Sequence, residues 1–172
     1  MAADPKSAVN GARKFNPAQP WRIEDSLDLY HVGAWGKGYF GVNSSGHVVV
    51  RPDTTAQHEI DLYEVVEGLK ARDLTTPVVV RFSDILAHRL RRMHEAFALA
   101  IAENDYHNEY AAVYPIKVNQ QRLVVEEVYR YGKEFGFGLE VGSKPELLAV
   151  MAITASSSGL EPTSSPKPNS WP

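Results

Sequence analysis

Strand-like and helical patterns alternate along the middle of this chain, and the alternation limits the folds that it can adopt. Largely apolar runs occupy residues 77–82, 110–116 and 137–141, and each leads into a stretch whose apolar residues have helical spacing. Successive runs lie roughly 30 residues apart, the length of a strand, a crossover helix and two connections. Neighbouring parallel strands need such a helix between them. The pattern therefore predicts an α/β fold with about three βα units on a parallel sheet.

A different pattern precedes these units. Residues 39–43 and 47–51 have the composition of two short strands, and the turn sequence Asn-Ser-Ser-Gly joins them. Further along, Asp61 stands three residues before Glu64, which is the spacing of a capping box, and a helical pattern follows. We expect a small β-hairpin and a helix in this part of the chain.

The two ends of the chain lack any periodic apolar pattern. The last 19 residues hold six serines and four prolines, and such a segment cannot bury enough surface to offset the entropy lost on folding. We expect four segments in all: a mobile arm (1–20), an aromatic hairpin and helix segment (21–76), the βα units (77–152) and a disordered Ser/Pro-rich tail (153–172).

Composition and charge narrow the possible functions. The 172 residues carry a net charge of -3, which gives no reason to expect nucleic acid or an anionic membrane as a partner. The chain has no cysteine, so a disulfide framework and a thiolate nucleophile are excluded, and its six histidines form no recognisable metal-binding pattern. No stretch reaches the roughly 18 apolar residues of a membrane span, and no signal peptide is recognisable. We expect a cytoplasmic protein.

Lys117 is the residue that most clearly suggests chemistry. It follows the apolar run where a strand turns toward a helix, and ligands of α/β sheets usually bind at that end of the strands. Burial there would disfavour the charged ammonium, so the amine could act as a nucleophile toward a carbonyl group and form a Schiff base. A lysine after a strand is also commonly a solvated surface residue, and its position alone does not separate the two interpretations.

A glycine pattern at residues 36–41 has the form G-x-G-x-x-G. A dinucleotide-binding loop of this form needs a strand before it and a helix after it, so that the helix N-terminus can hold the pyrophosphate. Here the predicted hairpin follows instead. We therefore interpret these residues as turn glycines.

The sequence around Lys117 is similar to that of one enzyme family. Residues 114–121 (Tyr-Pro-Ile-Lys-Val-Asn-Gln-Gln) and 138–147 (Gly-Leu-Glu-Val-Gly-Ser-Lys-Pro-Glu-Leu) resemble biosynthetic arginine decarboxylases, and the resemblance extends over residues 20–152. These are pyridoxal-phosphate-dependent enzymes with an alanine-racemase-like barrel. Because a complete (β/α)8 barrel needs eight strands and about 250 residues, the resemblance implies an incomplete barrel, the N-terminal part of such an enzyme.

The resemblance also implies a reaction. Lys117 would form a Schiff base with pyridoxal 5'-phosphate, and the cofactor would act as an electron sink while L-arginine loses CO2 to give agmatine, a polyamine precursor. Glu140 matches an acidic residue of related barrel decarboxylases and would orient Lys117 or support its protonated form. Alternatively, Glu140 pairs with Lys144 or caps a helix. Asn119 is explained as the N-cap of the next helix. The family further implies magnesium, to which no ligand is assigned here, and a homo-oligomer.

The same resemblance limits what the chain is expected to do alone. In the family, the groups that hold the phosphate, the cofactor ring and the guanidinium lie beyond the matching part, so we expect the isolated chain to be a fragment, a frameshift product or a truncation, and inactive. Two alternatives remain open. One is another barrel-type pyridoxal-phosphate decarboxylase or racemase. The other is a non-catalytic copy that binds full-length subunits through the open edges of its sheet.

Overall fold

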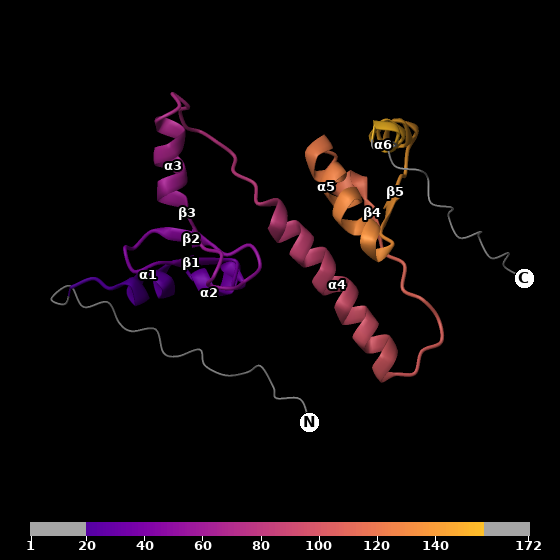
Figure 1. Ribbon diagram of the computed structural model, residues 1–172, viewed down its shortest axis with the longest axis horizontal. Helices are drawn as coiled ribbons and strands as arrows, with labels where there is room; N and C mark the ends of the chain where they lie inside the picture. The colour runs from indigo at the N-terminus through magenta and orange to yellow at the C-terminus, as the bar shows by residue number, and fades with distance from the viewer. Residues whose placement is uncertain (1–19, 157–172) are drawn as a thin grey trace, which may run out of the picture. The chain divides into compact units, whose positions relative to one another are not determined.

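The computed structural model describes residues 20–156 and shows a mixed α/β protein with two small sheets (Figure 1). Residues 1–19 of the expected mobile arm and residues 157–172 of the expected tail lie outside the described residues. The chain forms two compact units, which meet in sequence at Ile85 and Leu86.

The described residues of the first unit form a small antiparallel sheet with short helices before it and a longer one after it. The elements are α1 (Ile23–Leu29), α2 (Val32–Gly36), β1 (Phe40–Val42), β2 (Val48–Val50), β3 (Ile60–Asp61) and α3 (Leu62–Lys70).

Strands β1 and β2 form the hairpin that the sequence predicts. They pair antiparallel, and Gly46 in the connecting turn has a φ of 80°, a conformation that a residue without a Cβ adopts at little cost. Strand β3 pairs with β2, which makes β2 the central strand. Val49 and Val50 on β2 are fully buried, and Val32 and Tyr39 are also buried. The central position of β2 explains why Val49 and Val50 are the most buried residues of this unit.

The glycine pattern at residues 36–41 leads from a helix into this hairpin, as the interpretation as turn glycines requires. Gly36 is the last residue of α2, and Gly41 lies within β1. Between them Gly38 has a φ of 84°, which reverses the chain direction. No helix follows these glycines directly, so a dinucleotide has no helix N-terminus to bind here.

Helix α3 begins at the predicted cap. One oxygen of the Asp61 carboxylate accepts hydrogen bonds from the backbone N–H groups of Tyr63 (2.8 Å) and Glu64 (3.3 Å). The other oxygen accepts a bond from the Asn43 side chain and lies 2.8 Å from Nδ1 of His47. Partial desolvation raises the pKa of Asp61, but the hydrogen bonds from His47, Asn43 and the two backbone groups together lower that pKa below its ordinary value.

The lowered pKa of Asp61 makes the stability of the first unit depend on pH. A carboxylate with a depressed folded-state pKa stabilises the fold above its ordinary pKa of 3.8, and that contribution is lost as the pH falls through the folded-state value. We expect urea unfolding, followed by tryptophan fluorescence, to show declining stability below about pH 4. Asp61→Asn should flatten this decline, whereas Asp28→Asn, on the exposed side of α1, should not. An unchanged pH profile in Asp61→Asn would contradict the assignment.

The strand predicted over residues 77–82 is not formed, and that prediction was wrong. This stretch belongs to no strand ladder in the described structure, and the side chains of Val78, Val79 and Val80 are 41%, 83% and 43% exposed. Three consecutive valines have the composition of a buried strand, but a strand forms only where a neighbouring backbone pairs with it. The described chain therefore has two parallel strands instead of the predicted three.

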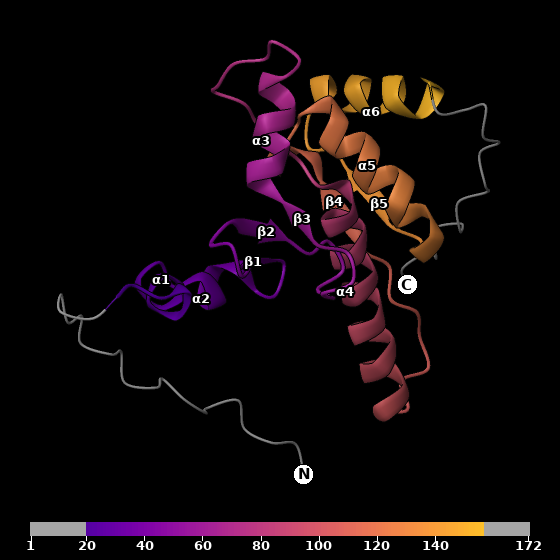
Figure 2. The same ribbon diagram turned by 60° about the vertical axis from the view of Figure 1, so that its left-hand side comes forward.

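The second unit contains the parallel pair. Its elements are α4 (Ser83–Glu103), which starts just before the unit, then β4 (Val113–Pro115), the 3-10 helix η1 (Ile116–Val118), α5 (Arg122–Gly132), the 3-10 helix η2 (Lys133–Phe135), β5 (Gly138–Glu140) and α6 (Lys144–Ser156). Strands β4 and β5 pair in parallel, and α5 lies beside them in both views (Figure 2). This arrangement confirms a βαβ unit built from two of the predicted strands.

Two clusters of buried side chains hold the second unit together. One consists of Leu90, Ala112 and Phe137, and the other of Ile116, Val125 and Ile153. The second cluster joins the end of β4, the helix α5 and the helix α6. This cluster includes Ile116, which lies next to Lys117 in the 3-10 helix η1.

Helix α4 is confirmed, but its apolar stripe is only partly covered. Leu90 is 6% exposed, whereas Met93 and Phe97 are 41% and 45% exposed. The ring of Phe97 stacks on Tyr110 with centroids 3.8 Å apart. The spacing of apolar residues thus predicts the helix correctly, while the extent of burial depends on which elements pack against it.

Helix α6 extends further than the sequence predicts. It runs through Ile153, which is 7% exposed, and ends at Ser156, so residues 153–156 of the expected tail are helical instead. Most residues of α6 after its first turn are apolar, and Leu148 and Met151 are 67% and 55% exposed. The buried Ile153 holds the last turn of the helix against the core.

Candidate active site

Lys117 lies in a short turn between a strand and a helix. Strand β4 ends at Pro115, and the 3-10 helix η1 carries Lys117 as its middle residue. Ile116, just before Lys117, is 2% exposed and anchors the turn to the core, whereas Val118, just after it, is 70% exposed. The turn is therefore attached to the protein through Ile116 and presents Lys117 at the surface.

The parallel pairing of β4 and β5 brings Lys117 next to Glu140. Pro115 pairs with Glu140 in the strand register, so the residue two positions after Pro115 is placed at the carboxyl end of β5. The Nζ atom of Lys117 lies 3.8 Å from Oε1 of Glu140. Lys117 and Glu140, the two predicted site residues, are thus close together although they lie 23 positions apart in the chain (140 minus 117). An amine and a carboxylate meet at the end of the sheet where ligands of α/β proteins bind.

The environment of Lys117 differs from the one expected. The sequence suggested an amine whose ammonium form is disfavoured by burial, but the Lys117 side chain is 64% exposed and that of Glu140 is 46% exposed. In these surroundings the amine is held by an ion pair with a carboxylate and is accessible to solvent. The expected desolvation is absent because the elements that surround Lys117 in the described structure cover only one side of it.

Asn119 does not cap helix α5, and that prediction was wrong by two residues. The cap position is Gln121, and Oδ1 of Asn119 accepts a hydrogen bond from the Gln121 backbone N–H at 3.0 Å. The backbone carbonyl of Asn119 accepts a bond from the hydroxyl of Tyr114 at 3.3 Å. Tyr114 was not among the residues predicted from the sequence. A half-buried tyrosine usually finds a partner for its hydroxyl, but both the burial of Tyr114 and its partner depend on the path of the backbone.

A capping arrangement follows Glu140 and confirms the predicted start of α6. The hydroxyl of Ser143 accepts a hydrogen bond from the Glu146 backbone N–H at 3.4 Å, and the Glu146 carboxylate accepts one from the Gly142 backbone N–H at 2.6 Å. Glu146 therefore performs the capping that was considered as an alternative role for Glu140. Glu140 remains available to pair with Lys117.

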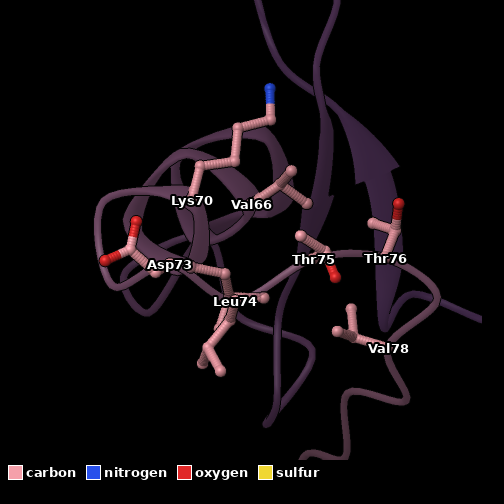
Figure 3. A pocket seen from close by; sticks show the side chains of 8 residues that line it. Val66, Lys70, Asp73, Leu74, Thr75, Thr76 and Val78 are labelled. Atoms are coloured by element: carbon pink, nitrogen blue, oxygen red, sulfur yellow. The ribbon is translucent and has the colours of Figure 1, made fainter.

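One hollow of about 310 Å³ lies beside the end of α3, within the first unit (Figure 3). Its lining includes Val66, Leu74 and Val78, together with Lys70. The Lys70 ammonium donates a hydrogen bond to Glu67 at 2.7 Å, and this bond raises the pKa of Lys70 above its ordinary value. The bond to Glu67 therefore favours the charged form of Lys70.

A second hollow of about 400 Å³ lies in the second unit, between α4 and the segment that leads into β4. It is lined by His94, Glu109 and Tyr110, among others. The Nδ1 atom of His94 is buried without a hydrogen-bond partner, and its ring stacks on Phe135. Neither of these two hollows is lined by Lys117 or Glu140, whose side chains are 64% and 46% exposed.

Within residues 20–156, no three His, Cys, Asp or Glu side chains gather where they could hold a metal ion. Among the helices of the same residues, none combines the length and the apolarity that crossing a bilayer requires.

Comparison with known proteins gives one consistent result. No model of a known protein family matches the chain. The chain is 47% identical over 149 residues to "Biosynthetic arginine decarboxylase 1" of Synechocystis, which covers 87% of the chain and 21% of that protein. It is 52% identical over 134 residues to "Biosynthetic arginine decarboxylase" of Gloeobacter violaceus, covering 78% of the chain and 21% of that protein. The corresponding protein of Bacteroides thetaiotaomicron is 49% identical over 140 residues, with 81% and 22% covered. The chain spans about a fifth of the length of these curated relatives.

Proposed function

We propose that this chain, which is homologous to about one fifth of biosynthetic arginine decarboxylase, supplies the cofactor lysine of such an enzyme, and that Lys117 is that lysine. The observation that carries the proposal is the meeting of Lys117 and Glu140 at the carboxyl ends of two parallel strands. The proposed reaction is the pyridoxal-phosphate-dependent conversion of L-arginine to agmatine and CO2, toward polyamines. The βαβ unit would be part of a (β/α)8 barrel.

The side chains at this site fit an aldehyde cofactor. Lys117 offers a primary amine, and a side chain that is 64% exposed is accessible to a carbonyl group. Pyridoxal phosphate, when bound, supplies an electron sink for the electrons left on the substrate as CO2 departs. Lys117 would hold the cofactor through its amine nitrogen and release it to the α-amine of the substrate.

Glu140 acts on the position and the charge of that nitrogen. An ion pair as exposed as this one contributes only about 0–1 kcal/mol to stability, so its role is not to hold the fold together. Its carboxylate would balance the positive charge on the Lys117 nitrogen and keep the side chain directed toward the end of β5. Glu140 is thus proposed as the residue that orients the lysine.

The open surface around Lys117 argues that the chain alone does not decarboxylate arginine. Decarboxylation benefits from a site that excludes water, whereas the side chains of Lys117 and Glu140 are 64% and 46% exposed. Neither described hollow adjoins them. We therefore infer that the chain holds the cofactor weakly and needs further protein around Lys117 for turnover.

Chemical trapping tests this proposal. The chain is incubated with pyridoxal phosphate, reduced with borohydride and digested, and the labelled lysines are mapped by mass spectrometry. We expect Lys117 to carry several-fold more label than Lys133 and Lys144, two exposed lysines of the same unit, because only Lys117 has Glu140 to balance the nitrogen charge. Equal labelling of the three would contradict the cofactor role. Agmatine formed by the chain alone would contradict the inferred inactivity.

Exposed apolar side chains favour a second candidate function, the binding of other decarboxylase subunits. Val113 on β4 and Leu148 on α6 are 58% and 67% exposed, and such side chains commonly belong to contacts with further protein. A binding role does not require a reactive amine at Lys117. Equal labelling of the three lysines in the trapping experiment would therefore leave binding as the remaining candidate function.

A further inference from the structure

We infer that Tyr114 is a positioning residue for Lys117, an inference that rests on the proposed function. The Tyr114 hydroxyl donates a hydrogen bond to the backbone carbonyl of Asn119 at 3.3 Å. Tyr114 precedes Lys117 by three residues and Asn119 follows it by two, so this bond spans the turn that carries the lysine.

The turn depends on bracing at its two ends because its middle makes few contacts with the protein. Lys117 and Val118 are both largely exposed. At the start of the turn, Ile116 is buried and the Tyr114 ring packs against the same core cluster. At the far end, the Asn119 side chain accepts the Gln121 N–H and leads into α5. The Tyr114 hydroxyl is the described link between these two ends.

The ring and the hydroxyl of Tyr114 have separable roles. The ring is part of the apolar cluster and contributes to the stability of the fold. The hydroxyl bond, at 3.3 Å, is longer than the usual O–H···O distance of about 2.7–2.8 Å, so it is a weak bond. Removing only the hydroxyl should therefore leave the fold intact and loosen the turn.

A more mobile turn is expected to lower the reactivity of Lys117, because the Lys117 amine must be held close to the Glu140 carboxylate. Lys117 reaches Glu140 only at 3.8 Å, and small displacements of a reacting group are costly to its reactivity. The hydroxyl of Tyr114 touches neither the cofactor lysine nor Glu140. It acts through the backbone at Asn119, and this is why we assign it a positioning role.

The variant Tyr114→Phe tests the inference in the same chain. We expect borohydride-fixed label at Lys117 to fall about threefold to tenfold, the effect of losing one hydrogen bond, while label at Lys144 stays unchanged. Thermal unfolding followed by circular dichroism should be nearly unaltered, because the ring is retained. Tyr110→Phe is the matched control, a partly buried tyrosine of the same unit that stacks on Phe97, and it should leave Lys117 labelling unchanged.

Amide hydrogen exchange separates failure of this inference from failure of the proposed function. Faster exchange at Val118 and Asn119 in Tyr114→Phe, together with reduced Lys117 labelling, would support the positioning role. Unchanged exchange would overturn it, and so would faster exchange with unchanged labelling. If the wild-type chain shows no preference for Lys117 over Lys144, the proposed function fails, and the exchange rates alone decide whether Tyr114 braces the turn.

Discussion

Replacing Lys117 by alanine is expected to remove all cofactor label from residues 114–121 and to reduce total label to the level of the ordinary surface lysines. The physical reason is that the proposed role makes the amine of Lys117 the nucleophile, and alanine offers none. Lys117→Arg is the sharper variant, because arginine keeps the positive charge beside Glu140 but stays protonated and does not condense with an aldehyde. Peptide mapping after borohydride reduction measures both variants.

The controls for this prediction lie in the same unit. Lys144→Ala removes another exposed lysine, and Lys117 should label as in the wild type. Glu140→Gln keeps the shape of the side chain but removes its charge, and it should reduce Lys117 labelling several-fold without abolishing it. If Lys117→Arg retains the specific label, or if Lys144→Ala loses it, Lys117 is not the cofactor lysine.

The variant Ile116→Ala is expected to lower the free energy of unfolding of the second unit by about 2–5 kcal/mol. Ile116 is 2% exposed and contacts the cluster with Val125 and Ile153, so truncation removes apolar burial and leaves a cavity. A loss of this size is a large fraction of the stability of a small unit. Urea unfolding followed by circular dichroism measures the change.

The neighbouring Val118 provides a matched control for this prediction. It lies in the same 3-10 helix as Ile116 but is 70% exposed, so Val118→Ala should change the unfolding free energy by less than about 0.5 kcal/mol. Ile116→Val should lie between the two, at about 0.5–1.5 kcal/mol. Equal effects of Ile116→Ala and Val118→Ala would mean that the turn is not anchored through Ile116.

The proximity of the two proposed site residues was predictable from the sequence, whereas their surroundings were not. Lys117 and Glu140 were both predicted at the ends of successive strands, and the parallel pairing of those strands does bring the two residues together. The exposure of the pair could not be predicted from the sequence, because it depends on which elements pack around the turn. The role of Tyr114 was also hidden, since it depends on the path of the backbone as far as Asn119.

The wrong prediction about the fold has a similar origin. The helix cap at Asp61 and the hairpin turn at Gly46 were predicted correctly, because each depends on residues a few positions apart. The prediction of a strand at residues 77–82 was wrong, although the composition of these residues is that of a strand. Its pairing would have required a backbone partner that lies far away in sequence, and local composition carries no information about that partner.

Local interactions thus account for the helices, the turns and the position of a lysine just after β4, since caps, glycines and apolar periodicity act within a few residues. Long-range packing decided three other features: that β4 pairs with β5, that Lys117 lies 3.8 Å from Glu140, and that the lysine remains largely open to water. These features depend on backbone pairing and burial between segments distant in the chain, where the free energy comes from neighbours that the local sequence does not specify.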